Sequence, residues 1–300
     1  MEEFAEKKKL MLRLVRNRRR NMILDALTVL FGSICIVCII ELAFYHVGSY
    51  RYQKSMQKLT DAIGGGIAED SIRKMNEARV NHDMLLFPDE TEHELIGYIS
   101  RFDEDVSDAW REKFEYLFSQ NNDCVGYIEV PDTKLSWPVM FVPEKYDKYL
   151  YRNFENKYEL RGLPFMDAET KIGKSRNYLI YGHNMNDETN FGTLRKYLDK
   201  KYCDAHPYVY FNTVLSEGVY QVMFVCRSKI FAKSDTCFKY YNYGGVLSEA
   251  QFNTYLREME KLALIDTGVT AEWGDELLSL STCDHYTDDG RLIVVCKRIQ

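Results

Sequence analysis

The feature that most constrains this chain is an apolar run near its N-terminus. Residues 24–45, LDALTVLFGSICIVCIIELAFY, contain no Lys or Arg, and the acidic residues Asp25 and Glu41 lie near the two ends of the run. A helix of about 20 apolar residues crosses the hydrocarbon core of a bilayer, which is roughly 30 Å thick. We therefore predict a single transmembrane helix over residues 24–45.

The charges that precede this run predict its orientation. Residues 1–20 carry eight Lys or Arg against three Glu, and basic flanks stay in the cytoplasm. We expect residues 1–23 to be a cytoplasmic tail, residues 24–45 to be an uncleaved signal-anchor in the cell membrane, and the C-terminal bulk to be extracellular. A cleaved signal peptide is the alternative, but the basic segment is long and no clear small-x-small cleavage site follows. A buried core helix would leave the basic cluster unexplained.

The rest of the chain is acidic. From His46 onward, 31 basic residues stand against 40 acidic ones, which argues against nucleic-acid binding. Two of the eight cysteines lie in the predicted span, and no CxxC pair occurs outside it, so a zinc site is not expected. Six cysteines lie beyond the span, and they permit disulfides that a domain of this size does not need: Cys124, Cys203, Cys226, Cys237, Cys283 and Cys296.

Three segments with different compositions follow the span. Residues 46–66 are typical of a juxtamembrane stalk and end in three glycines, and residues 67–120 are typical of N-terminal helices. In the latter, residues 67–82 favour a helix, and FPDETEHEL at 87–95 marks a turn and then a helix start. Residues 103–119 place five apolar residues on one helical face: Val106, Trp110, Phe114, Leu117 and Phe118.

Short strands dominate residues 121–300. Eight runs are rich in aromatic and β-branched residues, with turn residues between them, and they predict an antiparallel sandwich or barrel: CVGYIEV, KLSWPVMF, LPFMDAE, NYLIYGH, YVYFNTV, GVYQVMFVCRSKIF, LLSLSTCD and RLIVVCKRI. Residues 247–262, LSEAQFNTYLREMEKL, instead show a helical period. We predict a mainly β protein, with a barrel of about eight strands, N-terminal helices and one helix inserted between the last strand pairs.

The stretch LSTCDHYTDDGR at 280–291 raises the question of a reactive cysteine. A nucleophilic thiol needs a base or a cationic neighbour that favours the thiolate. His285 is close to Cys283 in sequence, whereas His183 ends an apolar run and precedes a polar loop, a common place for a catalytic group. Arg291 would lie beside Cys283 if 277–283 and 291–297 form an antiparallel hairpin, and a guanidinium there can stabilise an oxyanion.

Ordinary structural roles explain the same residues. A cysteine at a strand end is more often a packed thiol, a histidine after a strand is more often a surface or capping residue, and an arginine after Asp-Asp-Gly is more often a solvated turn charge. Residue chemistry by itself does not choose between His183 and His285 as the base.

A family resemblance bears on this choice. NYLIYGHNMNDETNFGTL and LSLSTCDHYTDDGRLIVV, together with a signal-anchor, resemble the sortases, the membrane-bound cysteine transpeptidases of Gram-positive bacteria. The shared pattern is a T/S-x-T-C strand end, an Arg on the next strand and a His after an upstream apolar strand. DCVGYIEVPDTKLSWPV and KYLYRNF…RGLPFMD are similar to the opening strands of class B members. The resemblance covers roughly residues 120–300 and implies a sortase-like closed β-barrel, with residues 121–300 as the catalytic domain.

The resemblance also implies roles for individual residues. Cys283 matches the family's nucleophile, His183 its histidine and Arg291 its arginine. Thr282 matches the residue that precedes the nucleophile, and the positions that line the sorting-signal groove in class B are matched by Tyr181, Ser281 and Leu150. The resemblance therefore implies four substrate-binding residues: Tyr181, Leu150, Ser281 and Thr282. Three residues depart from the pattern, and the last two leave the substrate preference open: Asp284, which is often Glu in class B, Tyr146, where some relatives have Asn, and the extra His285.

The implied reaction is a two-step acyl transfer. A thiolate attacks the peptide bond after the Thr of a sorting motif in a surface protein, and an amine then takes the acyl group from the thioester. In the family that amine belongs to a lipid-linked peptidoglycan precursor, or to a pilin lysine in polymerising members, and no metal or organic cofactor is required.

Two other functions compete with this interpretation. One is a secreted cysteine protease or peptidoglycan hydrolase, and the other is a membrane-anchored binding module without chemistry. A papain-like enzyme places its cysteine early and on a helix, whereas Cys283 is late and follows a strand. Whether Cys283 and Cys296 could form a disulfide depends on the register of their hairpin.

Overall fold

The computed structural model describes residues 2–63, 67 and 106–300, and of residues 2–10 and 12–15 the backbone alone. The predicted helix at 67–82 and the turn at 87–95 lie outside the described residues, except for residue 67. The chain divides into two compact units, Met1–Lys58 and Leu59–Gln300.

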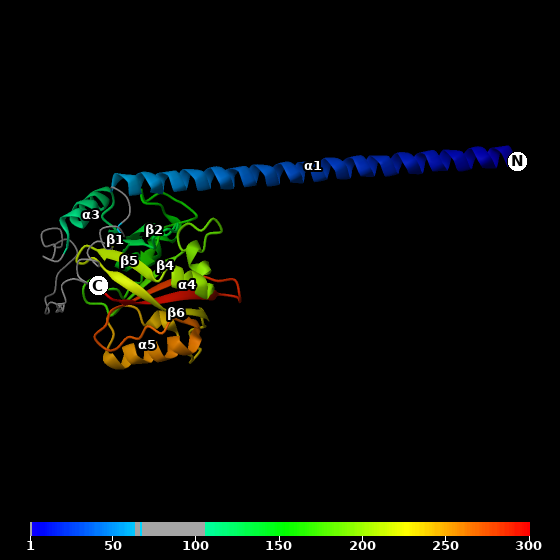
Figure 1. Ribbon diagram of the computed structural model, residues 1–300. Coiled ribbons are helices and arrows are strands. Elements are labelled where there is room, and N and C mark those ends of the chain that lie inside the picture. The colour runs from blue at the N-terminus through cyan, green and yellow to red at the C-terminus, as the bar shows by residue number, and fades with distance from the viewer. Residues whose placement is uncertain (1, 64–66, 68–105) are drawn as a thin grey trace. The chain divides into compact units, whose positions relative to one another are not determined.

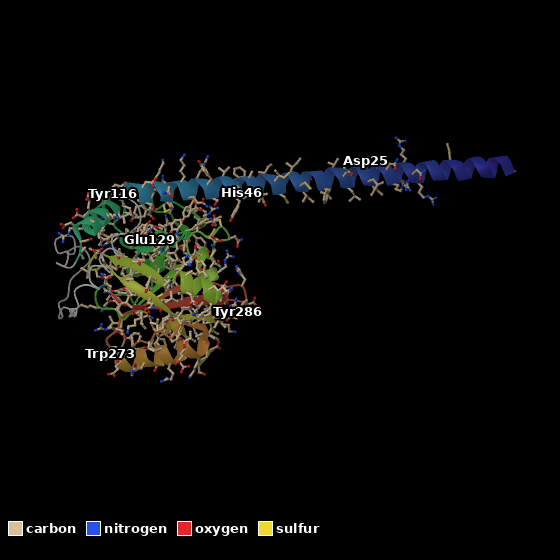
Figure 2. The ribbon with its side chains drawn as sticks, in the orientation of Figure 1. Asp25, His46, Tyr116, Glu129, Trp273 and Tyr286 are labelled. Atoms are coloured by element: carbon tan, nitrogen blue, oxygen red, sulfur yellow. The ribbon has the colours of Figure 1, made fainter. Side chains whose placement is uncertain are left out.

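A single long helix, α1 (Glu2–Ala62), makes up the first unit and continues into the second. Its segment Arg16–Ala62 contains an 18-residue window of mean hydropathy 2.6, and no residue of that window is buried. The side chains of this window project outward around the helix (Figure 2, where Asp25 is labelled). By length and composition this helix can cross a membrane, as the sequence predicts. The predicted stalk is helical up to Ala62.

The second unit is built on a closed barrel (Figure 1). The described strands form a ring in the order β5-β1-β2-β3-β4-β8-β9-β6, which the pairing of β6 with β5 closes, and a ninth strand pairs with β6 outside the ring. Eight strands in the ring agree with the prediction, whereas the ninth, β7, was not predicted. The strands are β1 (Cys124–Glu129), β2 (Ser136–Met140), β3 (Phe165–Met166), β4 (Asn177–Gly182), β5 (Tyr208–Thr213), β6 (Val219–Lys229), β7 (Ala263–Asp266), β8 (Leu277–Cys283) and β9 (Gly290–Arg298).

Two pairings in the ring differ from the antiparallel arrangement that the sequence predicts. β2 pairs with β3, and β4 with β8, in parallel. A parallel pair needs a long crossover connection, and β4 and β8 are separated by more than ninety residues that form β5, β6, β7 and α5 (Glu249–Leu262). Patterns within single strands do not reveal such a pairing.

Helix α3 (Asp108–Gln120) packs on the barrel through one face. Ser107 caps its N-terminus by accepting a hydrogen bond from the Trp110 amide, so the helix begins later than the predicted residue 103. Trp110, Phe114 and Leu117 are buried, and Trp110 Nε1 donates to the Thr213 carbonyl at 2.6 Å.

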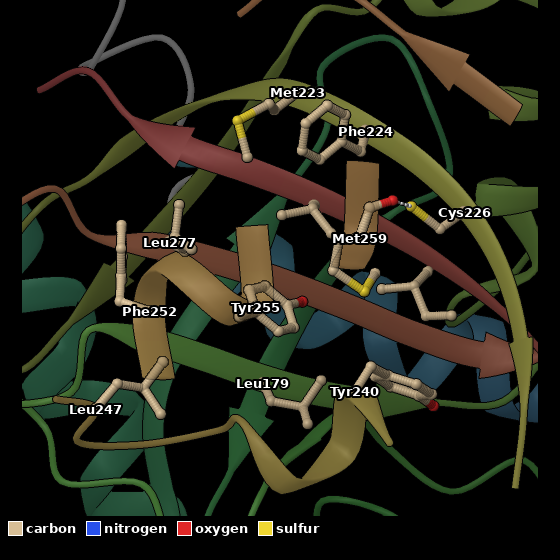
Figure 3. Packing of buried hydrophobic residues seen from close by; sticks show 12 residues of the cluster. Leu179, Met223, Phe224, Cys226, Tyr240, Leu247, Phe252, Tyr255, Met259 and Leu277 are labelled. Atoms are coloured by element: carbon tan, nitrogen blue, oxygen red, sulfur yellow. Dashed lines mark hydrogen bonds between the residues drawn. The ribbon is translucent and has the colours of Figure 1, made fainter. Parts of the chain in front are cut away.

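Helix α5 covers one outer face of the barrel, as predicted for an inserted helix. Ser248 and Gln251 form a capping box at its start. Its buried residues Phe252, Tyr255 and Met259 join a core cluster with side chains of β8 and β9 (Figure 3). Short helices complete the unit: η2 (Pro143–Tyr151), η3 (Gly192–Leu198), α4 (Lys200–Ala205) and η4 (Tyr240–Asn242).

Candidate active site

The parallel pairing of β4 and β8 brings His183 and Cys283 together. Gly182 is the register partner of Thr282, so His183 and Cys283 are the next residues along the two strands. Neighbouring strands lie about 4.8 Å apart, and parallel strands end at the same edge of a sheet. The histidine and the cysteine, separated by a hundred residues in sequence, therefore lie side by side at one end of the barrel, and both are half-buried.

Arg291 approaches the cysteine from the other side. β8 and β9 form the antiparallel hairpin that the sequence predicts, and Cys283 is paired directly with Arg291. The side chains of directly paired residues point to the same face. Arg291 Nη1 donates to the carbonyls of Asp289 and Gly290, at 3.1 and 2.9 Å. The guanidinium is thus held at the end of the hairpin that carries the thiol.

A main-chain carbonyl selects the tautomer of His183. Its Nε2 lies 2.7 Å from the carbonyl oxygen of Leu150 in η2. A carbonyl can only accept a hydrogen bond, so Nε2 must carry a proton in this arrangement, and Nδ1 remains for proton exchange. The Tyr151 ring packs against the imidazole with 5.6 Å between centroids. Leu150 thus contributes a carbonyl to the site.

The loop after His183 is hydrogen-bonded to the main chain of both Cys283 and His183. Asn184 Nδ2 donates to the carbonyl of Cys283 at 2.7 Å, and the Phe191 amide donates to the carbonyl of His183 at 3.0 Å. Gly182 has no space for a side chain, since an added Cβ would lie 2.5 Å from Asn190 Oδ1 and 2.6 Å from the Phe191 ring. The loop therefore folds back closely on the strand that presents His183.

Ser281 and Thr282 are fully buried, with 1% and 2% of their surface exposed. The Ser281 hydroxyl shares a 2.7 Å hydrogen bond with the hydroxyl of Tyr240, and the Thr282 hydroxyl donates to the carbonyl of Gly182 at 2.7 Å. Burial raises the pKa of Tyr240 to about 12, so the phenol stays protonated at neutral pH. These two hydroxyls act within the protein, where they hold β8 against β4 and η4.

Tyr181 on β4 is the register partner of Ser281, which lies two residues before Cys283 on β8, so Tyr181 is on the face of the sheet that carries the thiol. Its hydroxyl donates to Asp167 Oδ2 at 3.0 Å, and its ring packs on Phe165 at 5.6 Å between centroids. Burial raises the pKa of Tyr181, and it also raises the pKa of Asp167. Tyr146, which is 45% exposed, continues this aromatic row, with its ring 6.3 Å from that of Phe165.

The alternative base, His285, lies elsewhere. β8 ends at Cys283, and His285 is exposed on the turn that follows. Because the turn breaks the strand alternation, the i+2 spacing gives no reason for His285 to share a face with the thiol.

All eight cysteines are free. Cys296 is paired with Leu278, five residues along β8 from Cys283, which is about 17 Å on a strand. The register therefore excludes a Cys283–Cys296 disulfide within this hairpin. Within residues 2–63, 67 and 106–300, no group of three or more His, Cys, Asp or Glu side chains is arranged to hold a metal ion.

Sequence reasoning singled out His183, Cys283 and Arg291, and the structure brings these three together. It missed Asn184 and Tyr151, which touch the site. Asn184 directly follows the histidine in YGHN, which was a signal for it. Nothing in the sequence pattern pointed to Tyr151.

Comparison with known proteins identifies the family. The sortase domain family model matches residues 128–299. Sortase B of Listeria monocytogenes is 31% identical over 198 residues, which are 65% of this chain and 77% of that protein, and sortase B of Staphylococcus aureus is 29% identical over 191 residues, 63% and 75%. Among solved structures, the substrate complex of Staphylococcus aureus sortase B superimposes with a TM-score of 0.56 at 27% identity, covering 69% of this chain and 91% of that one. Sortase B of Bacillus anthracis gives 0.55 at 28% identity, covering 63% and 84%. The chain therefore belongs to the sortase family of cysteine transpeptidases, and the relatives that it matches are class B enzymes.

Proposed function

We propose that this chain cleaves a C-terminal sorting motif of surface proteins after a Thr and transfers the new acyl end to an amine of a lipid-linked peptidoglycan precursor. The observation that carries the proposal is the in-register pairing of β4 with β8, which sets His183 beside Cys283, while Arg291 is paired with the same cysteine across the hairpin. In this proposal Cys283 is the nucleophile, His183 the acid and base, and Arg291 the stabiliser of the oxyanion.

The first step forms a thioester. The thiolate of Cys283 attacks the carbonyl carbon of the Thr residue, and the carbonyl oxygen becomes an oxyanion that the Arg291 guanidinium stabilises. The C–N bond then breaks as the imidazolium of His183 gives the Nδ1 proton to the leaving amine. Nε2 keeps its own proton during both steps, because its N–H donates a hydrogen bond to the Leu150 carbonyl.

The second step reverses the roles of the histidine. The acceptor amine attacks the thioester carbonyl, Nδ1 of neutral His183 takes the proton that the amine loses, and the C–S bond breaks to regenerate the thiolate. One of the similar solved structures, a sortase B at 27% identity, is described as complexed with triglycine, a peptide that has a free amino group. A lysine of a pilin is the alternative acceptor, and water can replace the amine slowly.

The anchor fits this reaction. We propose that residues 1–23 are cytoplasmic, that residues 24–45 span the cell membrane, that residues 46–66 form a stalk, and that residues 67–120 precede a catalytic domain at 121–300. An extracellular enzyme tethered by one helix shares a membrane face with anchored substrates and with a lipid-linked acceptor. The long apolar helix α1 supports this arrangement.

We assign the sorting-signal site to the β4 and β8 face that carries the thiol. Tyr181 offers its ring there, because its hydroxyl is occupied by Asp167. Ser281, Thr282 and Leu150 belong to the same proposed substrate-binding site, where Leu150 holds His183 through its carbonyl and the buried hydroxyls of Ser281 and Thr282 fix the end of β8.

The test uses the full chain in detergent micelles with quenched fluorescent peptides of the NPxTx, LPxTG and SPxTG types. Cleavage is followed with and without triglycine for the wild type and for Cys283→Ala, His183→Ala, Arg291→Ala and His285→Ala. We expect cleavage after Thr and a triglycine adduct with the wild type and with His285→Ala, and loss of both with the other three. Cleavage that survives in Cys283→Ala, or that His285→Ala abolishes and His183→Ala does not, would overturn the assignment.

A further inference from the structure

A partly buried ion pair lies directly behind Cys283. Arg227 on β6 donates from Nε to Oδ2 of Asp284 at 2.6 Å, and the side chains are 34% and 13% exposed. Asp284 is the residue that follows the thiol, and Arg227 is far from it in sequence. The chemistry described above makes no use of either residue.

The register places this pair on the face of the hairpin opposite to the thiol. Leu292 is paired with Thr282 on one side and with Arg227 on the other, so these three share one face. Cys283 and Arg291 are one residue further along and point to the other face. The carboxylate of Asp284 is therefore held away from both groups.

Further contacts hold the turn between β8 and β9 against the end of β6. The Arg227 guanidinium lies over the Tyr286 ring, 5.0 Å from its centroid, and the Tyr286 hydroxyl donates to the Ser228 carbonyl at 2.9 Å (Tyr286 is labelled in Figure 2). The Ile230 amide donates to the carbonyl of Asp289 at 3.0 Å. Arg227 thus contacts both the carboxylate and the aromatic ring of the turn.

The carboxylate would disturb the site if it were released. The Asp284 amide donates to the carbonyl of Gly290 at 2.9 Å, and Arg291 Nη1 donates to the same carbonyl oxygen at 2.9 Å. The main chain of Asp284 and the Arg291 guanidinium therefore meet at one atom. Asp284 follows the cysteine at a strand end, where a turn lets its side chain rotate. A free carboxylate there would attract Arg291 and repel the negative thiolate.

We propose that Arg227 is a positioning residue that holds the Asp284 carboxylate away from Cys283 and Arg291. The inference rests on the proposed function, in which Cys283 reacts as a thiolate and Arg291 supports the oxyanion. Arg227 itself touches neither substrate nor thiol. Its effect passes through the carboxylate that it neutralises.

If the ion pair had a purely structural role, the contacts would be the same but the activities of the variants would follow a different pattern. If the ion pair only stiffened the turn, loss of either partner would break it equally, and Asp284→Asn would be as harmful as Arg227→Gln. If Arg227 instead restrains a harmful carboxylate, Asp284→Asn is mild by itself and also rescues Arg227→Gln. This difference is what a double-mutant cycle measures.

The experiment compares Arg227→Gln, Arg227→Lys, Asp284→Asn and the Arg227→Gln/Asp284→Asn double variant in the full chain in detergent micelles. We expect kcat/KM for peptide cleavage to fall about tenfold in Arg227→Gln and to lie within about threefold of wild type in Asp284→Asn and in the double variant, as for coupled neighbours. Arg227→Lys keeps a positive charge and should retain most of the activity. Arg257→Gln is the matched control, because Arg257, whose side chain is 59% exposed, forms an ion pair with Glu258 on α5.

A second readout does not depend on a substrate. The rate of iodoacetamide alkylation of Cys283, quantified on its own peptide by mass spectrometry, is followed against pH. Arg227→Gln should move the midpoint of this profile to higher pH, and Asp284→Asn in the same chain should move it back. The neighbouring elements carry these other charged or titratable groups: Tyr151, Tyr181, His183, Lys229, Tyr240, His285, Tyr286, Asp288, Asp289 and Arg291.

The outcomes separate the two proposals. Equal losses of kcat/KM in Arg227→Gln, Asp284→Asn and the double variant would identify a purely structural role and overturn the inference. An Arg227→Gln alkylation profile with the same midpoint as that of the wild type would also overturn it. Failure of the wild type to cleave any peptide would count against the proposed function, and the alkylation profiles would still decide the role of Arg227. Thermal unfolding of each variant shows whether it is folded.

Discussion

Asn184 should matter far more for catalysis than for stability. Its Nδ2 donates to the Cys283 carbonyl at 2.7 Å, which links the loop after the histidine to the cysteine residue itself. Asn184→Ala removes this bond, whose net contribution to stability is about 1 kcal/mol. It also removes Oδ1, a buried acceptor that has no hydrogen-bond partner among the described residues. These two effects oppose each other, so the free energy of unfolding should fall by at most about 1 kcal/mol, or about 2–4 °C in Tm for a unit of this size.

The catalytic effect follows from geometry. Without the bond, the loop that carries His183 can shift relative to Cys283, and a displacement of about 1 Å can cost about a hundredfold in rate. We expect kcat to fall between about tenfold and a hundredfold, while KM changes by less than about threefold. The assay is steady-state cleavage of the best peptide substrate, with thermal unfolding of the same samples.

Asn186→Ala is the matched control for this prediction. Asn186 is exposed in the same loop, and its side-chain oxygen accepts a 3.4 Å hydrogen bond from Arg195. Its kcat should stay within about twofold of wild type. An Asn184→Ala variant with normal kcat, or one whose kcat falls only in proportion to its unfolded fraction, would refute the reasoning.

Three further predictions follow from the packing. Gly182→Ala should lower the free energy of unfolding by about 1–3 kcal/mol in urea titrations, because its Cβ would overlap the side chains of Asn190 and Phe191; a change below about 0.5 kcal/mol would contradict the close approach. Burial raises the pKa of the Asp167 carboxyl above its ordinary value of 3.8, because burial favours the neutral form. The neutral carboxyl therefore contributes its full share to the free energy of unfolding below pH 3.8, and this contribution is lost as the pH rises through the raised pKa. The stability of Asp167→Asn relative to wild type should therefore increase between pH 4 and pH 7 in denaturant titrations, and a constant difference would show that the carboxyl titrates normally. Mild oxidation should not join Cys283 to Cys296, since their register separates them; a peptide linking the two in a non-reducing digest would show a different hairpin register.

Local patterns predicted the elements of this fold well. The short apolar runs LLSLSTCD and RLIVVCKRI, bounded by turn residues, predicted both strands of the hairpin, and the helical period at 247–262 predicted α5 to within two residues. The start of α3 was placed too early, because Val106 is buried like a helix residue while Ser107 caps the helix after it. β7 was missed, since its four residues ALID carry no pattern of their own beyond the end of α5.

The sequence by itself determined the apolar helix that is long enough to cross a membrane, the strand runs and the hairpin that pairs Cys283 with Arg291, because each depends on residues close together along the chain. Only the tertiary structure decided how His183, a hundred residues upstream, meets Cys283. That meeting requires β4 and β8 to pair in parallel across a connection of more than ninety residues, and the apolar runs of both strands are equally compatible with other partners. The contact between Arg227 and Asp284 has the same origin, since the long-range pairing of β6 with β9 brings the distant Arg227 guanidinium to the turn that follows Cys283. The types of residue that can do chemistry are visible in the sequence. Which of them come into contact depends on strand order and register, and these are set by the burial of apolar faces between distant segments.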